Sequence, residues 1–112
     1  MRSADAVEVA AGLKDQFLRR HKKDRQEALD AWASLVKWAP RLRRDAFAGT
    51  QIPKDRFPTR YRAYDNLWKL DLAHGYRAVY SVLARPGVAV VVAVDWMGDH
   101  DEYDRLFGYD SD

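Results

Sequence analysis

The stretch "VVVAVDWMGDHDEYDRLFGY", residues Val90–Tyr109, decides the fold, because an apolar run passes directly into the start of a helix. Residues 88–94 are apolar at every position, which predicts a central strand covered on both faces. Asp99, followed three residues later by Glu102, has the form of a capping box and predicts a helix that docks on the sheet through its apolar residues. The chain should therefore end in a strand and a short C-terminal helix.

Two more strand-like segments precede this one. The three segments are "NLWKLDL" at 66–72, "GYRAVYSVLA" at 75–84 and "GVAVVVAVDW" at 87–96. The breaks between them have the length of hairpin turns, which predicts an antiparallel meander.

The middle segment carries a charged residue that needs an explanation. Alternation along a strand places Arg77, Val79 and Ser81 on one face and Tyr76, Ala78, Tyr80 and Val82 on the other. Burial of a charge without a partner is costly. Arg77 therefore either forms a salt bridge with Asp71 or Asp95 on a neighbouring strand, or holds an anionic ligand.

The first 40 residues have helical periodicity in two parts. Asp24 and Glu27 have the form of a second capping box between the two parts, so we expect a helical hairpin that ends at Pro40. Residues 6–9 are a candidate for a short strand before the first helix. The apolar positions are Val9, Leu13 and Phe17 in the first part and Ala28, Leu29, Trp32, Leu35 and Val36 in the second.

These elements predict the fold class. We expect an α+β domain that spans residues 1–112, with a small antiparallel sheet of three to four strands packed on an N-terminal helical hairpin and followed by a short C-terminal helix. The length of 112 residues suits one core. The chain has no cysteine, which excludes thiolate catalysis and cysteine-ligated zinc, and it has neither a membrane-spanning run nor a signal-peptide pattern. A cytoplasmic protein is expected.

The net charge of +2 conceals a separation of charge along the chain. Residues 1–62 hold 15 Lys and Arg against 8 Asp and Glu, whereas residues 63–112 hold 4 against 9. The basic excess is densest in residues 41–62, where aromatic residues are interleaved. This pattern suits either a surface that binds a polyanion by pairing with its phosphates and stacking on its bases, or a solvated loop.

The last segment brings together residue types that carry out acid–base chemistry. His100 and Tyr103 are three residues apart and so predicted to share a helical face, which the capping box does not require. They are read either as a proton-transferring pair or as a surface histidine beside a core tyrosine.

The pairing of "WKLDLAHGYRAVYSV" with "VVVAVDWMGDHDEYDRLFGY" resembles the RelE/ParE toxin superfamily, and in particular its RelE and HigB-like branch. The likeness covers about residues 60–109 and rests on a strand of the form G-Y-R-x-x-Y followed by a terminal H-x-E-Y-D-like segment. It implies the toxin of a type II toxin–antitoxin system, an mRNA interferase that acts on mRNA, usually on the ribosome, and is neutralised by a protein antitoxin. No metal or other cofactor is expected.

The resemblance also implies roles for particular residues. Arg77 would hold the scissile phosphate, and His100 and Tyr103 would serve the 2′-OH and the leaving oxygen in metal-independent cleavage. The residues assigned to RNA binding by charge and position are Lys54, Arg56, Arg60, Arg62 and Arg105.

Three further readings differ from a metal-independent ribonuclease. The family's last segment is often basic, whereas acidic residues surround His100 here. The same fold could instead inhibit DNA gyrase, as ParE does, or act as a module that only binds other proteins. A metal enzyme that uses His100 with Asp99, Asp101 or His74 is disfavoured, because adjacent helical residues diverge in direction.

Overall fold

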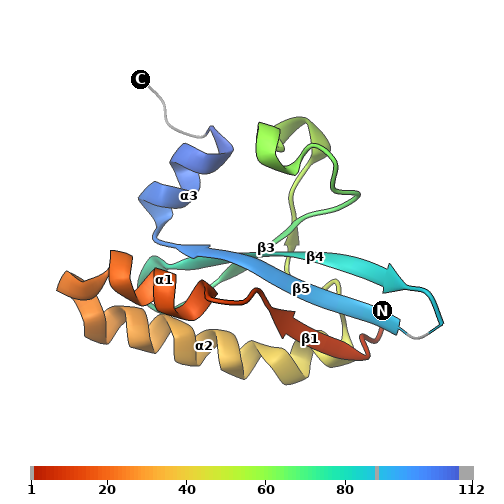
Figure 1. The fold of residues 1–112 in the computed structure, drawn as a ribbon, viewed down its shortest axis with the longest axis horizontal. Helices are drawn as coiled ribbons and strands as arrows, with labels where there is room; N and C mark the ends of the chain where they lie inside the picture. Colours follow the sequence, from red (N-terminus) through yellow and green to blue (C-terminus); the bar gives the residue numbers. More distant parts are fainter. Residues whose placement is uncertain (1, 88, 109–112) are drawn as a thin grey trace.

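The computed structural model describes residues 2–87 and 89–108 and has an α+β architecture built on one five-stranded mixed sheet (Figure 1). The strand order is β1-β5-β4-β3-β2. The strands are β1 (Ala6–Val9), β2 (Thr50–Gln51), β3 (Trp68–Asp71), β4 (Arg77–Arg85) and β5 (Ala89–Gly98), and the helices are α1 (Leu13–Arg20), α2 (Arg25–Arg44) and α3 (His100–Phe107).

The helical hairpin forms as predicted and covers one face of the sheet (Figure 1). Phe17 of α1 and Ala28 of α2 are fully buried against Tyr80 and Val92 from the sheet. Two predicted positions behave differently: Val9 belongs to β1, and Val36 is 55% exposed. The larger core therefore lies between the hairpin and the sheet.

The prediction that Pro40 ends the second helix is wrong, because α2 continues to Arg44. A proline leaves the carbonyl four residues earlier without its donor. That carbonyl belongs to Val36, on a residue that faces solvent, where water can satisfy it. Leu42, which is fully buried, anchors the turn beyond the proline.

The sheet is larger than the predicted three to four antiparallel strands. The meander of β3, β4 and β5 is antiparallel as expected, but β1 is an edge strand parallel to β5 and β2 is a second edge strand. The central position therefore belongs to β4 and not to β5, although Val91 and Val92 show that β5 is covered on both faces. Val88, part of that prediction, lies outside the described residues.

β2 depends on a close approach that only glycine allows. Gly49 donates a hydrogen bond from its backbone N–H to Tyr80 Oη at 3.0 Å, and Tyr80 donates to the Ala46 carbonyl at 2.8 Å. A Cβ on Gly49 would lie 2.7 Å from the Lys69 carbonyl oxygen. Burial raises the pKa of Tyr80 to about 12, so its hydroxyl remains a donor.

Of the two predicted capping boxes, one forms. Asp99 Oδ1 accepts from the Glu102 backbone N–H at 2.8 Å, and Glu102 Oε1 accepts from the Asp99 backbone N–H at 2.9 Å. Asp24 is the residue before α2, but its side chain makes no capping hydrogen bond. The difference lies in what precedes each helix: β5 delivers Asp99 in extended conformation, whereas a 3₁₀ turn delivers Asp24 with ψ of 42°.

In the ranges 2–87 and 89–108, no helix has both the length and the apolar character that crossing a bilayer requires.

Candidate functional site

The face of the sheet opposite the hairpin carries α3 and the segment 52–64, which stand side by side above it (Figure 1). These two elements and the sheet share a second, smaller core. Its buried members are Ile52, Tyr61, Leu67, Val79, Tyr103 and Phe107. All the predicted site residues lie on this side of the molecule or on the segments that cover it.

A β-bulge in β5 holds the segment 52–64 in place. Val94 pairs with Tyr80 and Trp96 with Val79, so Asp95 is the extra residue. Its two carboxylate oxygens accept hydrogen bonds from Tyr61 at 3.1 Å and Tyr64 at 3.0 Å. Asp95 is therefore engaged with this segment and not with Arg77.

Burial, together with those hydrogen bonds, keeps both tyrosines protonated. Burial and the neighbouring Asp95 raise the pKa of Tyr61 well above its ordinary value, and the same two causes raise the pKa of Tyr64. The two phenol groups therefore donate the hydrogen bonds that hold the segment 52–64 against the sheet.

Contacts with α1 hold the first turn of α3. Glu102 accepts from Arg20 Nε at 3.1 Å and lies 2.8 Å from His21 Nε2, while Arg20 also donates to the Met97 carbonyl at 2.6 Å. Burial opposes ionisation of Glu102, but the hydrogen bonds from the Asp99 backbone and Arg20 outweigh it and hold its pKa below the ordinary value. Glu102 thus links the two helices across the end of β5.

Arg77 lies at the start of β4, beneath α3, and its side chain is 25% exposed. Its Nε donates to Asp71 Oδ1 at 3.0 Å, which is one of the two salt bridges considered for it. Its Nη1 is buried and has no hydrogen-bond partner within the described part of the chain. A buried guanidinium donor without an acceptor is costly, so the pairing with Asp71 leaves Arg77 only partly satisfied.

Lys69 joins Arg77 above the ring of Tyr103. The guanidinium carbon of Arg77 is 5.4 Å from the Tyr103 ring centroid, and Lys69 Nζ is 5.9 Å from it. Lys69 Nζ is also 3.4 Å from Asp71 Oδ1. Two cations therefore share the exposed carboxylate of Asp71, an arrangement that favours binding of a further anion.

Sequence reasoning missed Lys69, although its position contained a usable indication. In "NLWKLDL" Lys69 and Asp71 alternate with the apolar residues of β3. The pairing of Lys69 with Val79 and of Asp71 with Arg77 places both residues on the face of the sheet that carries α3. There Lys69 is 22% exposed and contacts the Tyr103 ring, whereas Asp71 is 69% exposed.

The other two predicted catalytic residues occupy different environments. Tyr103 is 6% exposed and packs against Trp96 and Phe107. The His100 side chain is 61% exposed, and its Nε2 lies 3.2 Å from Asp101 Oδ1. The geometry thus brings Tyr103 to Arg77 and Lys69, and places His100 on the outer surface of the first turn of α3.

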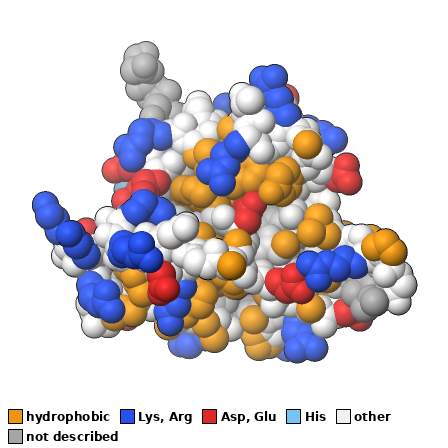
Figure 2. Space-filling model, in the orientation of Figure 1, with side chains coloured by type: hydrophobic (Ala, Val, Ile, Leu, Met, Phe, Trp, Pro, Cys, Tyr) orange, Lys and Arg blue, Asp and Glu red, His pale blue; other side chains and the backbone are white. Residues whose placement is uncertain are grey.

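The predicted RNA-binding cations are exposed and flank this face. Lys and Arg side chains lie over the loop and over α3, with hydrophobic side chains between them (Figure 2). Arg60 stacks on Tyr61, with 4.9 Å from its guanidinium carbon to the ring centroid. The cations are Lys54 and Arg56 in the 3₁₀ helix Lys54–Arg56, Arg60 and Arg62 on or next to the 3₁₀ helix Thr59–Tyr61, and Arg105 in the last turn of α3.

In the described ranges, one group of three side chains has metal-binding geometry, with ligand atoms of His21, Asp99 and Glu102 within 4.8 Å of one another. Asp99 and Glu102 already accept the capping hydrogen bonds, and Glu102 also binds Arg20 and His21. These contacts account for the cluster as a support for α3. His74, named in the disfavoured metal reading, instead lies 2.8 Å from Asp30.

Comparison of the chain with models of protein families, with curated proteins and with solved structures found no match in any of the three.

Proposed function

We propose that this chain is the toxin of a type II toxin–antitoxin system and cleaves mRNA on the ribosome without a metal ion. The observation that carries the proposal is the convergence of Arg77 and Lys69 on the ring of Tyr103, where one buried Arg77 donor has no acceptor among the described residues. The sequence resemblance to RelE and HigB-like toxins supports it. A protein antitoxin would neutralise the chain by covering this face.

The chemistry follows from the charges. Attack of a 2′-OH on the adjacent phosphate builds negative charge on the phosphoryl oxygens, and two preorganised cations stabilise that charge. Tyr103 supports both cations through its ring, and we assign its hydroxyl to orient the 2′-OH or to give a proton to the leaving 5′-oxygen. The exposed cations of the loop and of α3 would bind the flanking phosphates.

His100 has a narrower role in this proposal than the resemblance implies. Its exposed position beside Asp101 requires RNA to approach over the first turn of α3 before the imidazole can reach the phosphate. We propose that His100, from this outer position, accepts the proton that the 2′-OH loses as it attacks the phosphate.

The experiment is induction of the wild-type chain and its variants in cells without antitoxin, followed by mapping of new RNA 5′ ends. Arg77→Ala should abolish new cuts inside translated frames. Arg85→Ala is the matched control, because Arg85 ends the same strand, faces the same side and pairs with Glu8. Cleavage that survives Arg77→Ala with the fold intact would refute the proposal.

Two variants separate the roles of Tyr103 and His100, which both lie on α3. Tyr103→Phe keeps the ring under the cations and removes the hydroxyl, so unchanged cleavage would limit Tyr103 to support. His100→Ala should slow cleavage less than Arg77→Ala does, and an equal loss would place His100 at the reacting atoms.

A second function shares the fold and is favoured by one observation. Asp99, Asp101, Glu102 and Asp104 surround His100 and would repel RNA at that end of the site. A gyrase inhibitor or a protein-binding module would tolerate this charge. Growth arrest without new RNA ends, unaffected by His100→Ala and Tyr103→Phe, would select that alternative.

A further inference from the structure

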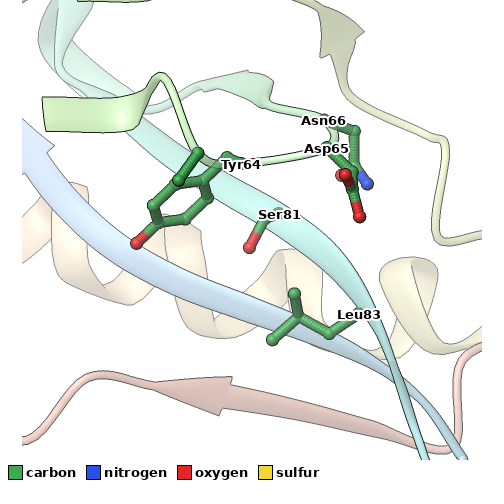
Figure 3. Close-up of a pocket in the computed structure, with 6 residues that line it drawn as sticks. Tyr64, Asp65, Asn66, Ser81 and Leu83 are labelled. Carbon is green, nitrogen blue, oxygen red and sulfur yellow. The ribbon is translucent and has the colours of Figure 1, made fainter. Parts of the chain in front are cut away.

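A pocket of about 310 Å³ lies between the segment 63–66 and the outer half of β4 (Figure 3). Tyr64 stands on one side, Asp65 and Asn66 on the other, and Ser81 and Leu83 of β4 line it from below. Its volume is at the lower end of the range for small-molecule sites, and its lining is mainly apolar. None of the residues predicted from the sequence to form a site lines it.

Asn66 and Tyr64 hold two walls of this pocket in place. Asn66 mimics a strand residue, because its side-chain amide donates to the Val82 carbonyl at 3.0 Å and accepts from the Val82 N–H at 2.7 Å. Tyr64 is held by its hydrogen bond to Asp95 and packs edge-on against Tyr61. The walls are thus fixed by side chains whose polar groups are already used, which leaves the ring of Tyr64 available for stacking.

The polar groups left for a ligand are few and specific. Within the described ranges no donor hydrogen-bonds to the Asp65 carboxylate, which is exposed at the pocket rim. A carboxylate only accepts hydrogen bonds, and it presents two oxygens side by side. A ligand that matches both the ring of Tyr64 and the carboxylate of Asp65 would be a flat ring with two adjacent N–H donors.

We propose that this pocket binds a nucleobase of single-stranded RNA, and that Asp65 favours guanine. Guanine carries N1–H and N2–H donors on its Watson–Crick edge, which match the two carboxylate oxygens, while its face stacks on Tyr64. The apolar side chain of Leu83, 41% exposed, would contact the base from below. Adenine and cytosine offer a single amino group and lack the paired donors.

The pocket is placed to read a base next to the cleavage site. Ser81 and Arg77 lie on the same face of β4 four residues apart, about 13 Å along a strand. Arg62, which directly precedes the segment 63–66, is an exposed cation that could bind the RNA backbone near the pocket. This part of the inference rests on the proposed ribonuclease function, whereas binding of the base itself does not.

The first test uses nucleosides, which lack phosphate and do not need the basic surface. In ¹H–¹⁵N spectra of the full chain, guanosine should shift Ser81 and Asn66. Inosine, which lacks the N2 amino group, should bind about 5- to 150-fold more weakly, the range that corresponds to loss of a bidentate base contact. Asp65→Asn should weaken guanosine binding to a similar degree.

Two variants make the result specific. Leu83→Trp fills the pocket from an exposed position and should prevent guanosine binding while the remaining spectrum is preserved. Asp55→Asn makes the same change of charge on an exposed residue outside the pocket and should have no effect. Equal binding of guanosine and inosine, or binding that survives both Asp65→Asn and Leu83→Trp, would overturn the proposal.

The second test separates the pocket from the ribonuclease function. In the mapped cuts, guanine should be enriched at one fixed position, and Asp65→Asn should remove that enrichment. Cleavage that depends on Arg77 but shows no base preference would overturn the role of the pocket in cleavage and leave the ribonuclease function intact. Guanosine binding without any cleavage would uphold the pocket and remove the ribonuclease function.

Discussion

The two faces of the sheet are built in different ways. The face under α1 and α2 is a regular apolar layer in which Phe17 and Tyr80 are fully buried. The opposite face has a smaller apolar core interrupted by polar contacts, namely Asp95 with two tyrosines and Arg77 with Asp71. The hairpin face therefore supplies most of the stability, and the other face holds the charged groups that can do chemistry.

Phe17→Ala should cause the largest decrease in the free energy of unfolding, and it tests how much the hairpin face contributes to stability. Removal of a fully buried phenylalanine costs about 3–5 kcal/mol through lost burial and the cavity left behind. Urea denaturation followed by circular dichroism would measure it. A decrease of less than about 1 kcal/mol would show that the face relaxes around the cavity. It would contradict the conclusion that the hairpin face supplies most of the stability.

Asp95→Ala should decrease the free energy of unfolding by a smaller amount. Its local effect should be confined to the face opposite the hairpin. It leaves the hydroxyls of Tyr61 and Tyr64 without their acceptor, which costs about 1–3 kcal/mol for a buried group. Hydrogen exchange should accelerate in residues 52–64 and not in α1 or α2. Asp55→Ala, at an exposed position on the same segment, is the control and should leave exchange unchanged.

Asp99→Ala and Asp24→Ala compare the starts of two helices on opposite faces. Loss of the cap formed by Asp99 should lower the free energy of unfolding by about 1 kcal/mol. Asp24→Ala should change it less, because the Asp24 side chain makes no capping hydrogen bond. Equal effects in thermal unfolding would mean that Asp99 contributes only through its charge.

The smallest effect should be a pH dependence from Glu102. Its pKa is lower in the folded chain, so its contribution to stability is present above the ordinary carboxyl pKa and is lost as the pH falls through the folded value. The difference in melting temperature between wild type and Glu102→Gln should therefore shrink on acidification from about pH 7 to pH 3. A difference that stays constant with pH would mean that Glu102 stabilises the fold by packing and not through its charge.

The amino-acid sequence by itself determined the elements whose patterns are local. Periodicity located the hairpin and the three strands of the meander, and alternation along β4 placed Arg77 and Val79 together on the face opposite Tyr80. The capping box at Asp99 was also readable, because its two partners are three residues apart. Such patterns succeed when the interacting residues are neighbours in the chain.

Only the tertiary structure decided the features that join distant residues. The two-residue strand β2, the parallel pairing of β1 and the bulge at Asp95 have no local pattern, since each depends on a partner strand far along the chain. The same holds for Lys69 beside Arg77, which cross-strand register brings together, and for the pocket that Asn66 forms by bonding to the backbone of β4. The identical spacing of Asp24 with Glu27 and of Asp99 with Glu102 gave different outcomes, because the preceding element sets the backbone angle that a cap requires.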